Sequence, residues 1–235
     1  MSETVAFVGS VGGVGTTRVT LACAELLAGN GRDTAVLDAA YGTQGLADRT
    51  TGRIAPDMTQ LCLEEVPLGE GLIDRSLQGG GRLAICPARA PFSRLAQAKS
   101  PDAAQRFEAR IAEAVRQFEY VLIDTPPIAA NQAVAAVTGA KTVAVVSDEE
   151  RAESSIPRTA DRLADIGVDE FSTIVTHAAS HPDADATVPT LETEPPVIDE
   201  TATAHDAFCD VLETTVGLSI EPETTDGLLS GLSFR

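Results

Sequence analysis

The sequence contains no tryptophan, and aromatic residues make up only 4% of its 235 residues. We therefore expect a core built mostly from Ala, Val, Leu and Ile, and a hydrophobic content of 43% is enough for a folded globule. The length suits one α/β domain with a sizeable core. We predict a single domain over residues 1–217, followed by an acidic linker and a short apolar tail over residues 218–235.

Lysine is also nearly missing, since Lys99 and Lys141 are the only two in the chain. The net charge is −18. A lysine-poor surface rich in carboxylates is typical of proteins from a high-salt cytoplasm, such as that of halophilic archaea, where salt screens the repulsion between surface acids. An ordinary acidic mesophilic protein is the alternative. In either case, the charge disfavours direct binding to nucleic acid or to anionic lipid.

Cysteine is scarce, and the four cysteines are widely spaced without a C-x-x-C pair. This pattern indicates buried or half-buried thiols in a reducing compartment rather than a disulfide framework or a zinc site. The sequence also lacks an apolar run of the roughly 18–20 residues that a membrane span needs. Its first residues lead straight into an expected strand, with no signal peptide. We therefore expect a cytoplasmic protein without stable membrane insertion.

Short β-branched runs alternate with helical patterns along the chain, which is typical of a parallel sheet wound with helices. This alternation predicts an α/β fold with a doubly wound, mostly parallel sheet of about seven strands and helices on both faces. The expected strands are Thr4–Val8, Thr34–Leu37, Arg82–Cys86, Tyr120–Ile123, Thr142–Val146 and Ser172–Val175. The expected helices are Thr16–Ala28, Met58–Leu63, Gly71–Leu77, Asp102–Gln117, Asn131–Val137, Ala152–Asp165 and Thr203–Thr215. Residues 178–200 are expected to be loop with at most a short edge strand.

A glycine-rich stretch between the first expected strand and helix matches most of a phosphate-binding loop, G-x-x-x-x-G-K-[ST]. Thr16 stands at the lysine position of that pattern, and Thr17 stands at the position of the magnesium-binding hydroxyl. Backbone amides and a helix N-terminus favour an anion even without the lysine. A tight strand-to-helix turn is the alternative. The candidate phosphate-binding residues are Gly12, Gly13, Val14, Gly15, Thr16, Thr17 and Arg18.

Four segments within roughly residues 4–177 carry a resemblance to a known family. Residues 11–17 read V-G-G-V-G-T-T, which resembles the deviant Walker A loop, K-G-G-V-G-K-T, of the MinD/ParA family of ATPases. Residues 36–46, V-L-D-A-A-Y-G-T-Q-G-L, resemble its switch I segment, and residues 120–127, Y-V-L-I-D-T-P-P, resemble its Walker B and switch II strand. Residues 154–163 resemble the helix after its fifth strand. The resemblance implies a P-loop NTPase fold, bound ATP or ADP with Mg²⁺, and a dimer that sandwiches two nucleotides.

Several charged groups that the resemblance would require are replaced in this chain. The family's two loop lysines correspond to Val11 and Thr16, and the second switch I aspartate corresponds to Ala40. The asparagine that follows in switch I corresponds to Gly45. Phosphoryl transfer is catalysed mostly by positioning and charge stabilisation, so we expect little turnover.

The remaining candidate site residues keep roles that the resemblance implies. Thr17 and Asp124 are the candidate magnesium ligands, and Asp38 is a candidate hydrogen-bonding or structural acid of switch I. Arg18 either substitutes for the lost lysine or is a solvated residue on the helix surface. His177 either contacts the nucleotide base or ends a strand without that role.

The favoured hypothesis is a degenerate MinD/ParA-like regulatory or scaffolding module in the spatial organisation of division, motility, chemosensory or chromosome machinery. It implies a homodimer or a heterodimer with an intact paralogue, and the C-terminal tail is a possible docking segment for a protein partner. Two alternatives stay open. One is an active ATPase in which Arg18 or a partner residue restores the missing charge, and the other is a structural protein that binds no nucleotide.

Overall fold

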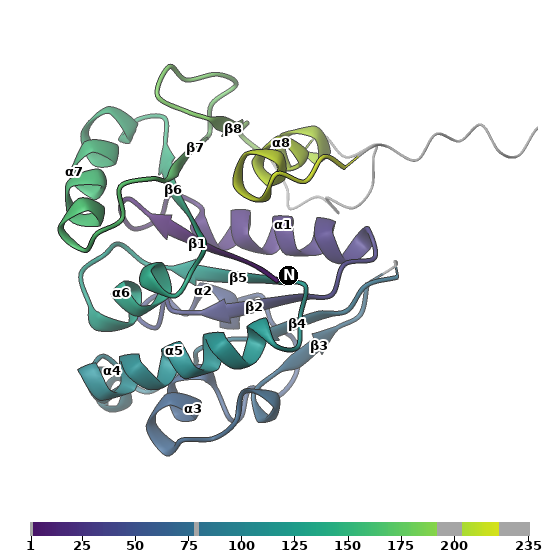
Figure 1. Cartoon of the computed structure of the whole chain (residues 1–235), viewed down its shortest axis with the longest axis vertical. Helices are drawn as coiled ribbons and strands as arrows, with labels where there is room; N and C mark the ends of the chain where they lie inside the picture. The colour runs from purple at the N-terminus through teal and green to yellow at the C-terminus, as the bar shows by residue number, and fades with distance from the viewer. Residues whose placement is uncertain (1, 78–79, 192–203, 221–235) are drawn as a thin grey trace, which may run out of the picture.

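A computed structural model describes residues 2–77, 80–191 and 204–220. These residues include an eight-stranded sheet with the order β3-β4-β2-β5-β1-β6-β7-β8 (Figure 1). All neighbouring strands are parallel except β3 and β4, which pair antiparallel. The strands are β1 (Glu3–Gly9), β2 (Thr34–Asp38), β3 (Ile73–Arg75), β4 (Leu83–Cys86), β5 (Tyr120–Thr125), β6 (Thr142–Asp148), β7 (Ser172–Thr176) and β8 (Ala186–Val188).

Helices cover both faces of this sheet, as the sequence predicts. They are α1 (Thr16–Gly29), α2 (Gly45–Asp48), α3 (Met58–Glu64), α4 (Phe92–Ala98), α5 (Pro101–Val115), α6 (Asn131–Thr138), α7 (Ala152–Asp165) and α8 (His205–Val216). Figure 1 shows α1 and α8 on one side of the central strands and α5 on the other. The doubly wound, mostly parallel α/β fold is therefore confirmed, with eight strands in place of about seven.

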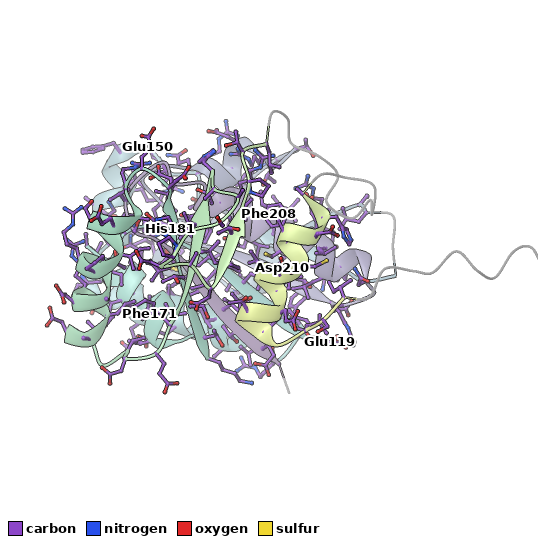
Figure 2. The ribbon with its side chains drawn as sticks, turned by 90° about the horizontal axis from the view of Figure 1, so that it is seen from above. Glu119, Glu150, Phe171, His181, Phe208 and Asp210 are labelled. Atoms are coloured by element: carbon purple, nitrogen blue, oxygen red, sulfur yellow. The ribbon has the colours of Figure 1, made fainter. Side chains whose placement is uncertain are left out.

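The side chains of β1 alternate between two parts of the core, because successive residues of a strand point to opposite faces. Val5 and Phe7 pack with α1 and α8, whereas Ala6 and Val8 pack with α6 and α7. Phe208 of α8 is fully buried against the first of these faces (Figure 2). The few aromatic residues thus supplement a core that is otherwise built from aliphatic side chains.

The parallel register brings the carboxyl ends of the central strands to one edge of the sheet. Asp38 at the end of β2 is the register partner of Asp124 in β5, and Phe7 of β1 is also paired with Asp124. Ligands of open α/β sheets bind outside this edge. The loop between β1 and α1 leaves the sheet here, which places the glycine-rich segment beside the two aspartates.

The predicted helix over Gly71–Leu77 is wrong. This segment contains the edge strand β3, in which Ile73 pairs with Ile85 and Arg75 pairs with Leu83. Hydrogen bonds to the free edge of β4 outweigh the weak helical pattern of so short a segment.

Other boundaries follow the prediction more closely. The short helices α2 and α4 were not predicted, and β8 is the short edge strand expected within residues 178–200. The last predicted helix is present as α8, although its expected first residue lies outside the described residues. The apolar tail predicted at the C-terminus also lies outside them from residue 221 onward.

Candidate functional site

The loop between β1 and α1 has the backbone conformation of an anion cradle. Gly13 and Gly15 have φ values of +81° and +86°, a region that L-residues with side chains rarely adopt. Gly15 is also the N-cap of α1, so the first amides of this helix have no side-chain cap. The exposed amides and the helix dipole both favour a negatively charged group at this point.

A chain of three buried hydroxyl groups fixes the start of the loop. The Ser155 hydroxyl on α7 donates to the Ser10 Oγ at 2.8 Å, and it lies 2.9 Å from the Ser147 Oγ at the end of β6. Ser10 also donates its backbone N–H to the Val146 carbonyl at 2.8 Å. The loop is therefore tied to both β6 and α7 before its first glycine.

Two further contacts hold the middle of the loop through its carbonyl oxygens. Arg151 Nη1 donates to the Gly12 carbonyl at 3.0 Å, and the Thr176 hydroxyl donates to the Val14 carbonyl at 2.9 Å. Asp148 orients Arg151 by accepting its backbone N–H and several guanidinium hydrogen bonds. These bonds lower the pKa of Asp148 below its ordinary value. Arg151 was not predicted from the sequence, because only the fold brings it to the loop.

An open cavity of about 290 Å³ lies beside the loop at the carboxyl edge of the sheet. It brings together seven of the predicted site residues: Gly12, Gly13, Gly15, Thr16, Thr17, Arg18 and Asp124. Three others do not line it. Val14 is buried in the core with only its carbonyl turned toward Thr176, Asp38 is fully buried, and His177 is exposed at the end of β7.

Thr17 and Asp124 are in direct contact at the wall of this cavity. The Thr17 hydroxyl donates to Asp124 Oδ2 at 2.6 Å, whereas the buried Oδ1 has no hydrogen-bond partner. Burial raises the pKa of Asp124 to about 6, although the Thr17 hydrogen bond and the positive charge of Arg49 both lower it. A buried carboxylate with an unpartnered oxygen, next to a hydroxyl, is a donor set that suits Mg²⁺. The residues present therefore fit a magnesium ion bound together with phosphate.

Asp38 has a different role from Asp124, although the two are register partners. Asp38 Oδ1 accepts the Ala40 N–H at 2.8 Å, and Oδ2 accepts the Ala88 N–H at 2.9 Å. Burial, followed by the nearby charge of Asp124, raises the pKa of Asp38 well above its ordinary value. Since both of its oxygens are used by backbone groups, Asp38 connects the segments that follow β2 and β4. This geometry supports the structural reading of Asp38.

Comparison with solved structures identifies a common fold. The septum site-determining protein MinD of Pyrococcus horikoshii, complexed with Mg-ADP, aligns with a TM-score of 0.71 at 16% identity, covering 91% of this chain and 95% of that one. A plasmid partition protein of Borrelia burgdorferi bound to AMPPNP aligns with a TM-score of 0.72 at 14% identity, covering 91% and 97%. The chain has the fold of MinD- and ParA-type ATPases. The sequence matches no family model and no curated protein.

The same fold also serves a different chemistry. The cobyrinic acid a,c-diamide synthase of Mycobacterium smegmatis, with bound ADP and magnesium, aligns with a TM-score of 0.70 at 17% identity, covering 94% of this chain and 100% of that one. At such low identities the likeness shows the fold alone. A function for this chain must therefore be argued from the residues of its own site.

The four residues that stand where the family resemblance implies two lysines, an aspartate and an asparagine all line the cavity. They are Val11, Thr16, Ala40 and Gly45. In the part of the chain that the structure describes, the charged residues of the lining are Arg18, Arg49 and Asp124. Arg49 was not predicted from the sequence, where it stands as one more arginine in a polar segment. The cavity therefore keeps the glycine loop and the Thr17–Asp124 pair. Its positively charged residues are Arg18 and Arg49, whereas the two lysine positions hold Val11 and Thr16.

Proposed function

We propose that this protein binds ATP or ADP with Mg²⁺ in the cavity beside its glycine-rich loop, and that it acts as a regulatory or scaffolding module with slow or no ATP hydrolysis. One observation carries the proposal. The cavity retains the glycine cradle and the Thr17–Asp124 pair with its unpartnered buried oxygen, while Val11, Thr16 and Ala40 occupy the positions where charged catalytic groups would stand.

Thr17 and Asp124 are the residues that would hold the magnesium ion. In P-loop NTPases a bound Mg²⁺ neutralises charge on the β- and γ-phosphates. The amides of the glycine loop would orient the phosphates, and the N-terminus of α1 would stabilise their negative charge. Nucleotide and magnesium in the structural neighbours are consistent with this proposal.

Slow hydrolysis follows from the side chains that line the cavity. A single cationic group at the transferred phosphate is worth about 10³-fold or more in rate. Val11 and Thr16 carry no charge, and Ala40 has no carboxylate to position water. Arg18 and Arg49 lie in the cavity wall and give nucleotide binding a source of positive charge.

The proposed cellular role is spatial organisation, as in cell division or the positioning of other machinery. Its support is the fold shared with MinD proteins and with a plasmid partition protein. We further propose a homodimer or a heterodimer with a family paralogue, and a cytoplasm of high salt concentration as the working environment. Among the described residues, no helix is long and apolar enough to span a membrane.

Calorimetric titration of ATP and ADP into the full chain, with Mg²⁺ and in multimolar KCl, tests the binding proposal. A phosphate-release assay under the same conditions tests the absence of hydrolysis. Micromolar binding without phosphate release supports the proposal, whereas turnover at the rates of ordinary ATPases would establish the active-ATPase alternative. Absence of binding by either nucleotide would favour a structural protein.

A pair of matched variants separates binding at this cavity from a general effect of charge. Asp124→Asn keeps the size of the side chain but removes the charge that would hold the metal, so we expect it to weaken Mg²⁺-dependent binding. Asp74→Asn makes the same change on the edge strand β3, away from the cavity, and should leave binding unchanged. Equal effects of both variants would contradict the assignment of the cavity.

A further inference from the structure

Arg49 reaches the nucleotide cavity from a segment that the phosphate-binding loop does not include. It is the C-cap residue of α2, which lies in the segment after β2, and its side chain lines the cavity together with Thr17 and Asp124. Its Nη1 donates to the Gly45 carbonyl at 3.5 Å, so the side chain turns back along α2 toward that glycine.

Gly45 in turn lies directly against Thr17, the hydroxyl member of the Thr17–Asp124 pair. A Cβ atom at Gly45 would be 3.1 Å from Thr17 Oγ1, and this hydroxyl is the one that donates to Asp124. The guanidinium group of Arg49 therefore lies at the same end of the cavity as Thr17 and Asp124, the proposed metal ligands.

We propose that Arg49 binds the terminal phosphate of a nucleoside triphosphate in this cavity and makes the chain prefer the triphosphate over the diphosphate. The inference rests on the proposed nucleotide binding and adds to it the residue that distinguishes the two nucleotides.

The position of the Thr17–Asp124 pair supports the placement of the terminal phosphate beside Arg49. Thr17 and Asp124 would hold a magnesium ion, which in P-loop NTPases neutralises charge at the outer phosphates. A cation beside these two residues would thus face the γ-phosphate end. Arg18 lies in the first turn of α1, where the loop amides would bind the inner phosphates that ATP and ADP share.

The chemistry of the side chain also suits this role. A guanidinium group presents a planar fork of donors that matches two phosphate oxygens, and it stays charged at every relevant pH. Arg49 is exposed, so its movement onto a phosphate requires no repacking of the core. An arginine from the α2 segment would thereby replace part of the charge that the two absent loop lysines would have supplied.

Nucleotide titrations of Arg49→Ala test the proposal, with Arg53→Ala as the matched control. Arg53 is an exposed arginine four residues later that does not line the cavity, so the control makes the same change in net charge. We expect Arg49→Ala to weaken Mg²⁺-ATP binding by about tenfold to a hundredfold and ADP binding by less than about threefold. Arg53→Ala should change neither affinity.

Two more variants sharpen the result. Arg49→Lys keeps the charge but loses the fork, so we expect it to recover part of the ATP affinity. Arg18→Ala should weaken ATP and ADP binding equally, since the inner phosphates are common to both nucleotides.

The outcomes separate this inference from the function on which it rests. If the unaltered protein binds neither nucleotide, both proposals are overturned. If it binds both nucleotides, but Arg49→Ala behaves as Arg53→Ala does or weakens ATP and ADP equally, nucleotide binding stands and the role of Arg49 is overturned.

Discussion

Replacing Thr17 by valine removes the one hydrogen bond that the described residues make to the Asp124 carboxylate. The Thr17 hydroxyl lies 2.6 Å from Asp124 Oδ2, Asp124 is 1% exposed, and its Oδ1 is unpartnered. Valine has nearly the same shape as threonine, so the packing changes little. A hydrogen bond to a buried ionised carboxylate contributes about 1.5–3 kcal/mol, whereas a bond to a neutral group contributes about 0.5–1.5 kcal/mol. The loss in stability should therefore depend on whether Asp124 is ionised.

The pKa of Asp124 gives the direction of this pH dependence. Burial raises it from 3.8 to about 6, so the folded carboxyl binds its proton more tightly than the unfolded one does. The contribution of Asp124 to the free energy of unfolding then decreases as pH rises from about 4 to about 6. The Thr17 hydrogen bond lowers the pKa. Its removal should raise the pKa further, so that Thr17→Val continues to lose stability above pH 6.

Urea unfolding at pH 8 and pH 5, in the same KCl concentration and without nucleotide or Mg²⁺, measures the effect. We expect Thr17→Val to lower the free energy of unfolding by about 1.5–3 kcal/mol at pH 8 and by about 1 kcal/mol at pH 5. Thr20→Val is the matched control, because the buried Thr20 hydroxyl donates to the neutral Thr16 carbonyl at 3.0 Å. Thr20→Val should lower the free energy of unfolding by the same amount at both pH values. A Thr17→Val cost that is equal at the two pH values, or larger at pH 5, would refute the reasoning.

Three other predictions concern the loop, the metal site and the core. Arg151→Ala should lower the free energy of unfolding by about 1 kcal/mol, a modest loss because the side chain is partly exposed. It should also speed hydrogen exchange of the Ser10 amide, which bonds the Val146 carbonyl at the start of the loop. Thermal unfolding and mass spectrometry would measure the two effects, and unchanged exchange would contradict the role of Arg151 in holding the loop. Binding of Mg²⁺-ATP should weaken below about pH 6, where Asp124 is protonated and cannot ligate the metal; calorimetry that finds a constant affinity from pH 5 to pH 8 would exclude this ligand. Phe208→Ala should lower the free energy of unfolding by about 3–5 kcal/mol in urea, since it leaves a cavity where α8 packs on the sheet; a cost under about 1 kcal/mol would show that α8 contributes little to the core.

The parallel strands and the phosphate-binding loop can be predicted from the sequence alone. Continuous β-branched runs identify strands that are buried on both faces, and they do so independently of distant contacts. The glycines of the loop are required by its own backbone, as the positive φ of Gly13 and Gly15 shows. Asp124 ends one of the buried runs, so its place at the edge of the sheet follows from local pattern alone.

Long-range contacts explain what the sequence could not predict. The strand β3 depends on the free edge of β4, which its own three residues do not encode. Arg49 and Arg151 stand in polar segments where an arginine is ordinary, and only the path of the chain brings them to the cavity and to the loop. Asp38 does not line the cavity, and one of its oxygens accepts the N–H of Ala88, a residue far along the chain that its own segment does not predict.

The hydroxyl chain of Ser10, Ser155 and Ser147 anchors the glycine loop with groups that carry no charge. Dissolved ions weaken attractions between exposed charges, but they have little effect on buried contacts between neutral dipoles. The anchor is therefore insensitive to ionic strength, and it does not titrate between pH 4 and pH 9. The start of the loop can in this way keep its position across conditions that alter the charged surface of so acidic a chain, including the partly exposed Arg151–Asp148 ion pair beside the middle of the loop.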